Sequence, residues 1–234
     1  MGADVLEVAA PRASRAARIA LLGNPNTGKT TLFNQLCGLR AKTSNFPGTT
    51  TTIRTGTLVD HDARIEIVDL PGLYDLQSQR PERDLALEVL RDPARKPDAI
   101  VVVIDALNLP RNLVLCGELR ALGLPLVVAL NMMDMAADRD IVIDAAVLSA
   151  RLGCAVVPMV ARRGTGLPDL RRALEQAIAA RPGPSAPGPV SVEGLAEWAD
   201  GIAAASITRG ELSATHPLTD RKSTRLNSSH ANIS

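Results

Sequence analysis

The sequence contains few aromatic residues, which make up only 2% of its 234 positions, so any interior must rest on Val, Ile, Leu and Ala. Its three cysteines (Cys37, Cys116 and Cys154) are scattered and lack C-x-x-C spacing. This pattern argues against a zinc site or a disulfide framework and favours reduced, intracellular core residues. No apolar run approaches the roughly 20 residues that a bilayer-spanning helix needs, and residues 1–17 lack the apolar stretch of a secretion signal. These absences predict a soluble cytosolic chain.

The sequence also lacks an excess of either charge, because its formal net charge is +1. A charge so close to zero gives no electrostatic argument for nucleic acid as the main partner. By contrast, 46% apolar and 22% charged residues are typical of a chain that buries a sizeable core.

Short apolar runs alternate with helical patterns, which indicates an α/β fold with a mostly parallel sheet flanked by helices. Six strands are expected, at residues 19–22, 51–59 (an edge strand), 65–68, 99–104, 126–130 and 155–158. Helices are expected at residues 29–37, 81–91, 111–122, 140–152 and 168–180. Gly38, Gly123 and Gly153 stand where glycine commonly ends a helix.

Composition divides the chain into five parts. Residues 1–17 form a flexible N-terminus, and residues 18–180 hold the α/β domain. Residues 181–190 are rich in Pro and Gly and therefore form a linker. Residues 191–220 form an incomplete helical, regulatory segment, the start of a small helical domain. Residues 221–234 are polar and aperiodic and resemble translated vector sequence attached to a truncated gene.

The clearest motif is G-x-x-x-x-G-K-[ST], and it lies between a predicted strand and a predicted helix. Backbone N–H groups and a helix N-terminus in this arrangement hold phosphates, while the lysine reaches the β- and γ-oxygens and the threonine binds Mg²⁺. The predicted nucleotide-binding residues are Gly23, Asn24, Pro25, Asn26, Thr27, Gly28, Lys29, Thr30 and Thr31.

Two further motifs follow the next strands. In Asp69-Leu70-Pro71-Gly72, the carboxylate can hold Mg²⁺ through water and the Gly72 N–H can meet the γ-phosphate. In Asn131-Met132-Met133-Asp134, the carboxylate can accept two hydrogen bonds from guanine, whereas adenine offers no such donor pair. Asn131 can reach the base or pin the phosphate loop. The order of motifs predicts a P-loop NTPase of the Ras-like G-domain kind that binds GTP and GDP.

A threonine after the first helix can complete the Mg²⁺ shell and sense the γ-phosphate. From the residues alone, Thr49, Thr50, Thr51 and Thr52 are equivalent candidates.

The phrases GNPNTGKTTLFNQLCG, SNFPGTTTTIRTG, DLPGLYDL and GLPLVVALNMMD resemble the N-terminal G domain of FeoB-type ferrous iron transport proteins. The resemblance implies that Thr50 is the switch threonine and a Mg²⁺ ligand. It also implies that Asn26 helps to bind an activating K⁺, with backbone carbonyls from Ser44 and Phe46. Lys29, Asn26, Thr50 and Gly72 are the catalytic residues in this interpretation. Val160, Ala161 and Arg162 resemble a fifth, guanine-contacting motif in which the Ala161 N–H meets the base.

Three positions affect this interpretation. Leu73 stands where Ras-like proteins keep a glutamine that orients water, so slow, K⁺-stimulated turnover is expected. Phe46 replaces the family's usual tryptophan, and Asp75 replaces its common serine and adds a charge after Gly72.

The resemblance implies a GTPase that couples to or gates Fe²⁺ uptake at the cytoplasmic face of the bacterial inner membrane. The implied partners are downstream helical and transmembrane iron-channel domains, small Feo accessory proteins and a second copy of the chain. Two alternatives stay open: a soluble RNA- or ribosome-associated assembly GTPase, and a nucleotide-sensing module with little hydrolysis.

Overall fold

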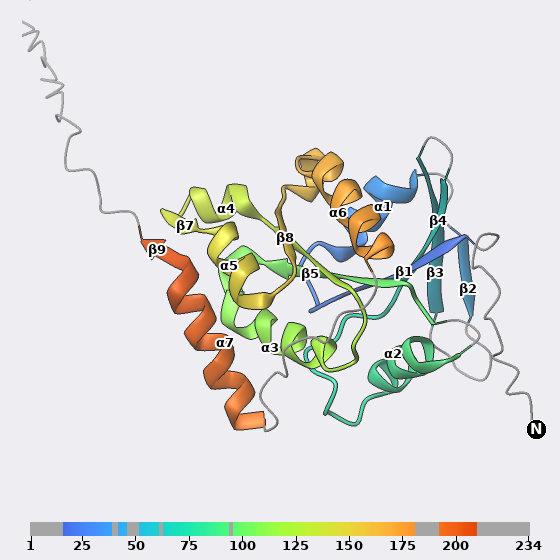
Figure 1. Cartoon of the computed structure of the whole chain (residues 1–234), viewed down its shortest axis with the longest axis horizontal. Helices are drawn as coiled ribbons and strands as arrows, with labels where there is room; N and C mark the ends of the chain where they lie inside the picture. Colours follow the sequence, from blue (N-terminus) through green and yellow to red (C-terminus); the bar gives the residue numbers. More distant parts are fainter. Residues whose placement is uncertain are drawn as a thin grey trace, which may run out of the picture.

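The computed structural model describes residues 16–38, 42–45, 52–60, 63–93, 96–180 and 192–209. A seven-stranded sheet in the order β2-β3-β4-β1-β5-β6-β8 forms its centre (Figure 1). Its strands are β1 (Ala17–Gly23), β2 (Lys42–Asn45), β3 (Thr52–Asp60), β4 (Ala63–Asp69), β5 (Ala99–Asp105), β6 (Leu126–Asn131) and β8 (Ala155–Pro158).

The sheet is mostly parallel, as the sequence predicts. β1 pairs in parallel with β4 and β5, and β6 pairs in parallel with β5 and β8. β3 runs antiparallel to β4, and β2 is antiparallel to β3. All six predicted strands are present. β3, predicted as an edge strand, is instead an inner strand, because β2 adds a short strand of polar residues outside it.

Helices cover both faces of the sheet (Figure 1). They are α1 (Lys29–Cys37), α2 (Pro81–Arg91), α3 (Leu109–Arg120), α4 (Met133–Ala137), α5 (Ala145–Leu152), α6 (Leu167–Ala179) and α7 (Val192–Ser206). Gly38 and Gly153 end α1 and α5 with positive φ, as predicted. Gly123 also has a positive φ, but α3 ends earlier, with Ala121 as its cap. Among the described residues, no helix has both the length and the apolar character needed to cross a bilayer.

The strands carry apolar side chains on both faces, which explains their nearly continuous apolar sequence. Along β5, Ile100, Val102 and Ile104 belong to one core cluster, which includes residues of α2, α3, α5 and α7. Val101 and Val103 point the other way and belong to a second cluster, with α1 and α6. In the resulting three-layer α/β/α arrangement, helices cover the two faces of the sheet, so a functional site is expected at the carboxyl edge of the parallel strands.

The prediction of one helix over residues 140–152 is wrong in its first part. Residues Ile141–Ile143 form β7, which pairs antiparallel with β9 (Ile207–Arg209) in a separate two-stranded sheet. α5 begins only after Asp144, whose carboxylate accepts hydrogen bonds from the N–H groups of Ala146 and Val147. The β-branched Ile-Val-Ile sequence favours a strand, but its partner lies more than 60 positions away, which no local pattern indicates.

Candidate nucleotide-binding site

The predicted motifs meet at the carboxyl edge of the main sheet. β1 ends at Gly23, β4 at Asp69, β6 at Asn131 and β8 at Pro158, and these strands are parallel. Ligands of open α/β sheets bind outside the carboxyl ends of their strands. The fold therefore gathers four segments that are distant in sequence at one candidate site.

The phosphate loop, residues 24–28, connects β1 to the N-terminus of α1. Gly28 immediately precedes the helix with a φ of 86°, and Asn26 has a φ of 67°, in the left-handed region that asparagine tolerates better than most residues. The Thr27 hydroxyl donates to the Asn24 carbonyl at 2.9 Å. Asn24 is buried, and within the described part of the chain its side-chain atoms have no hydrogen-bond partner.

Asn131 joins the phosphate loop to the loop that follows β8. Its Nδ2 donates to the Thr27 carbonyl at 2.9 Å, and its Oδ1 accepts the Ala161 N–H at 2.9 Å. A Cβ on Gly28 would lie 2.3 Å from Asn131 Nδ2, so only glycine fits beneath this amide. Asn131 thus takes the pinning role of its two predicted roles. The Ala161 N–H, which the resemblance assigned to the base, donates to Asn131 instead.

The Asp69 and Gly72 motif lies against the phosphate loop. Asp69 is buried at the end of β4, and its carboxylate forms an ion pair with Lys29. A Cβ on Gly72 would lie 3.2 Å from the backbone nitrogen of Pro25, a closer approach than most side chains allow. Lys29, predicted to bind phosphate, and Asp69, predicted to hold Mg²⁺, are therefore in direct contact.

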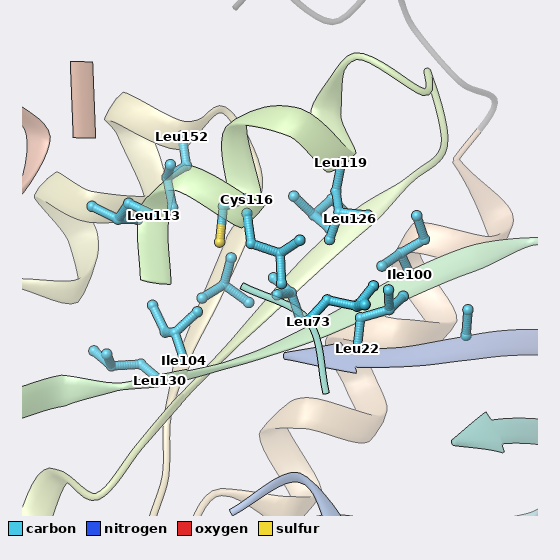
Figure 2. Close-up of a cluster of buried hydrophobic side chains, with 14 of the residues drawn as sticks. Leu22, Leu73, Ile100, Ile104, Leu113, Cys116, Leu119, Leu126, Leu130 and Leu152 are labelled. Atoms are coloured by element: carbon cyan, nitrogen blue, oxygen red, sulfur yellow. The ribbon is translucent and has the colours of Figure 1, made fainter. Parts of the chain in front are cut away.

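Leu73 points into the core rather than toward the phosphate loop. Its N–H donates to the Gly23 carbonyl at 3.1 Å, while its side chain is only 3% exposed. Figure 2 shows that side chain among Leu22, Ile100 and Cys116. The position where Ras-like proteins keep glutamine thus contributes packing and no polar group.

Asp75 forms a local turn instead of adding a free charge. Its Oδ1 accepts the N–H groups of Gln77 at 3.0 Å and Ser78 at 2.6 Å. Burial by itself raises the pKa of Asp75, but the hydrogen bonds from Ser78 and Gln77 outweigh it and hold the pKa below its ordinary value. Aspartate is well suited to such a turn because its short carboxylate reaches the backbone two or three residues ahead.

Two helices hold the backbone of Leu76. The Leu76 N–H donates to Glu118 Oε2 on α3 at 2.6 Å, and its carbonyl accepts Arg83 Nε of α2 at 2.9 Å. Arg111 of α3 also lies over the Tyr74 ring at 4.3 Å from its centroid. Sequence analysis missed these contacts, because Glu118 and Arg111 stand on a helix without a motif.

At the base end, Asp134 lies in the short helix α4 and is paired. Its Oδ2 accepts Arg162 Nε at 3.0 Å and Arg162 Nη2 at 2.5 Å, and its Oδ1 accepts the Met135 N–H at 3.0 Å. The hydrogen bonds from Arg162 hold the pKa of Asp134 below its ordinary value. The carboxylate is therefore ionised at neutral pH and oriented by its neighbours.

The other predicted site residues divide into two groups. Thr30 and Thr31 are exposed in the first turn of α1, Met132 precedes α4 with a φ of 65°, and Val160 bridges to Thr165. Thr50 and Phe46 lie outside the described residues, and Ser44 lies in β2 with only its backbone described. Among the described residues, no group of three or more His, Cys, Asp and Glu side chains could hold a metal ion.

A phosphate loop after β1, a carboxylate at the end of β4 and an N-x-x-D sequence after β6 define a G domain, a guanine-nucleotide-binding class of P-loop protein. The model of the family described as ferrous iron transport protein B matches residues 17–174. The chain therefore belongs to the FeoB family.

Individual relatives agree with this assignment. The chain is 43% identical over 160 residues to the Fe(2+) transporter FeoB of Salmonella typhimurium, an alignment that covers 68% of this chain and 21% of that protein. The same values hold for the transporter of Escherichia coli strain K12. This chain thus spans about a fifth of the length of the curated relatives it matches.

Solved structures share the fold. The cytosolic domain of L. pneumophila FeoB has a TM-score of 0.68 and 41% identity, covering 75% of this chain and 73% of that chain. A GDP-bound variant of S. thermophilus NFeoB has a TM-score of 0.63 and 38% identity, covering 69% of this chain and 60% of that chain. The fold is that of a GTPase family whose members bind guanine nucleotides.

Proposed function

We propose that this chain is the GTP-binding and GTP-hydrolysing cytosolic domain of a ferrous iron transporter. The observation that carries the proposal is the bridge made by Asn131, which bonds both Thr27 in the phosphate loop and Ala161. Through this bridge, the segment that ends in Asp134 and the phosphate loop form one frame. Phosphate-binding and guanine-reading groups are thereby held at a fixed spacing, as a nucleotide requires.

At the phosphate end, backbone N–H groups of the loop and the Lys29 ammonium bind the β- and γ-phosphates. Lys29 exchanges its ion pair with Asp69 for the phosphate oxygens. The Asp69 carboxylate and the Thr30 hydroxyl are hard oxygen donors, which fit Mg²⁺. Bound Mg²⁺ neutralises charge that develops on the phosphates during transfer.

At the base end, the ionised Asp134 carboxylate accepts hydrogen bonds from the ring N–H and the amino group of guanine. Adenine would leave this carboxylate without donors, and such a loss is costly. The selectivity for guanine therefore comes from one carboxylate and its spacing from the phosphate loop.

Hydrolysis proceeds without a glutamine, because Leu73 is packed in the core. The Gly72 N–H meets the γ-phosphate, and Thr50 senses it. Asn26, with the backbone carbonyls of Ser44 and Phe46, would hold an activating K⁺, which would supply positive charge beside the phosphates. Turnover that depends on backbone groups and cations alone is slow.

The test compares GTP turnover by the full chain in matched KCl and NaCl buffers with Mg²⁺. We expect K⁺ to raise turnover several-fold, and we expect Asn26→Ala to abolish that increase. Because Asn26 has positive φ, alanine there is strained. Asn26→Gly therefore serves as the second variant, which removes the amide and keeps the backbone conformation.

An Asp134→Asn variant controls for contaminating GTPases, because it should lose GTP turnover in either salt. Turnover that ignores K⁺ while GDP still binds would reject the role of Asn26. A chain that binds GTP and scarcely hydrolyses it would instead be a nucleotide-sensing module.

The relatives' name, Fe(2+) transporter, describes proteins of which this chain spans 21%. We infer that the nucleotide state of this domain drives or gates Fe²⁺ uptake across the bacterial inner membrane, through helical and transmembrane domains that follow residues 191–220. Measuring iron uptake into vesicles that contain the parent protein distinguishes driving from gating. Iron uptake with a non-hydrolysable GTP analogue indicates gating, whereas uptake only during hydrolysis indicates driving.

A further inference from the structure

Arg162 holds the carboxylate that the guanine base needs. Two of its three donor nitrogens, Nε at 3.0 Å and Nη2 at 2.5 Å, donate to Oδ2 of Asp134. The other oxygen, Oδ1, accepts the Met135 N–H at 3.0 Å. Both carboxylate oxygens of Asp134 thus already accept hydrogen bonds from groups of the same protein.

The competing groups have the same donor pattern. Guanine carries three nitrogens on one carbon, and its ring N–H and amino group point the same way, as two N–H groups of a guanidinium do. A carboxylate that recognises guanine by two adjacent N–H donors therefore also recognises arginine. Adenine has no such pair, so the mimicry is specific to the base that Asp134 selects.

We propose that Arg162 is an internal competitor for guanine, which a guanine nucleotide must displace from Asp134 in order to bind. The inference rests on the proposed guanine-nucleotide function and assigns Arg162 a role in setting the nucleotide association rate. This role differs from a contact with the bound base.

The two partners differ in exposure, because the Asp134 side chain is only 13% exposed. The Arg162 side chain is 61% exposed, so it can swing into solvent without opening the core. Ion pairs of which one partner lies largely in solvent are weak, and the loss of this one corresponds to a change in affinity of about two- to fivefold. Arg162 therefore slows binding without preventing it.

Arg163 provides a matched control. It stands next in the sequence and is similarly exposed, at 66%, but its Nη2 lies 4.0 Å from Asp134 Oδ2. Replacing either arginine by alanine removes one positive charge from the same loop. Only Arg162→Ala removes hydrogen bonds to the carboxylate.

The experiment measures association and dissociation of a fluorescent GDP by stopped flow, using the full chain and the variants Arg162→Ala and Arg163→Ala. We expect Arg162→Ala to bind about two to five times faster, with an unchanged dissociation rate, while Arg163→Ala matches the unmodified chain. High salt should reduce the difference, because it screens the ion pair.

A second pair of variants, made in the Asp134→Asn protein, tests whether the effect of Arg162 requires the Asp134 carboxylate. Asp134→Asn presents an amide that suits the ring N–H and C2 carbonyl of xanthine, so xanthosine diphosphate is the probe. There, Arg162→Ala should leave the association rate unchanged, because no carboxylate remains for Arg162 to hold.

The outcomes separate the two proposals. If the unmodified chain binds GDP and Arg162→Ala binds it at the same rate, or releases it faster, Arg162 is no competitor and the inference fails alone. If neither the unmodified chain nor any variant binds GDP, the proposed function fails as well.

Discussion

Single residues at this site serve two loops at once, so one substitution acts in two places. The Asn131 amide bonds a carbonyl of the phosphate loop and an N–H of the loop after β8. Gly72, which has no side chain, allows the segment after Asp69 to approach the phosphate loop at Pro25. The site therefore depends on a few buried contacts more than on the number of its residues.

Asn131→Ala tests this dependence. The variant leaves the Thr27 carbonyl and the Ala161 N–H without their partner, and each buried orphan costs about 1–3 kcal/mol. We expect lower stability in urea unfolding and about tenfold weaker GDP binding, which corresponds to 1.4 kcal/mol.

Asn112→Ala is the matched control for that variant. Asn112 is also buried, and its amide bonds the Asn108 carbonyl and the Asp105 N–H at the start of α3. It should lose stability to a similar degree and keep its GDP affinity. Equal losses of affinity in both variants would show that Asn131 has no special link to the site.

At the scale of elements, two helices hold the segment that follows Gly72 in place. The Leu76 backbone is fixed between Arg83 of α2 and Glu118 of α3. Burial raises the pKa of Glu118, and the Leu76 hydrogen bond offsets this only in part, so the pKa stays above its ordinary value near 4.5. The charged form of Glu118 is therefore tolerated in the fold at a cost in stability.

A pH-dependent stability difference follows from the raised pKa. The folded protein binds the Glu118 proton more tightly than the unfolded chain, so this group stabilises the fold at acidic pH. That contribution is lost as the pH rises from 4.5 through the folded pKa. Glu118→Gln keeps an oxygen acceptor for Leu76 and carries no charge.

We expect Glu118→Gln to be more stable than the unmodified chain in urea unfolding at neutral pH, with the gain vanishing near pH 4.5. Glu88→Gln, at an exposed position on α2, should change stability little at any pH. A gain for Glu118→Gln that is the same at every pH would contradict the titration of Glu118.

On the scale of the whole molecule, α7 belongs to the same core as the G domain. Ala199, Ile202 and Ala203 of α7 are buried in the cluster that contains α3 and α5. Figure 1 shows α7 beside these helices. We therefore propose that α7 is docked on the G domain, from which it can lead to a helical domain.

Two glycines test this docking with opposite expected signs. A Cβ on Gly117 of α3 would lie 2.4 Å from Leu195 Cδ1 and 2.9 Å from Trp198 Cζ3 of α7, whereas a Cβ on Gly201 of α7 meets nothing within 4 Å. Gly201→Ala should stabilise the protein by about 0.5–1 kcal/mol through helix propensity. Gly117→Ala should lose that benefit to the clash and lower the stability. Equal gains in urea unfolding would mean that α7 does not pack on α3.

The parts of the site that are continuous in the chain can be predicted from local sequence. The phosphate loop, the Asp69 motif and the Asn131 motif could be predicted because each combines a fixed local spacing with the strand before it. Five strands of the main sheet were likewise predicted, since strands buried on both faces have apolar runs that contrast with their flanking glycines and polar residues. The Thr, Ile and Val content of β3 predicted a sixth.

Which side chains meet across those parts depends on the folded structure. The hydrogen bond from Leu76 to Glu118 and the pair between Asp134 and Arg162 join residues 42 and 28 positions apart. The inward position of Leu73 depends on a core built from several elements. The pairing of β7 with β9 spans a still longer separation. Hydrogen bonds and contacts of this kind have no sequence spacing of their own, because folding sets the distance between their partners.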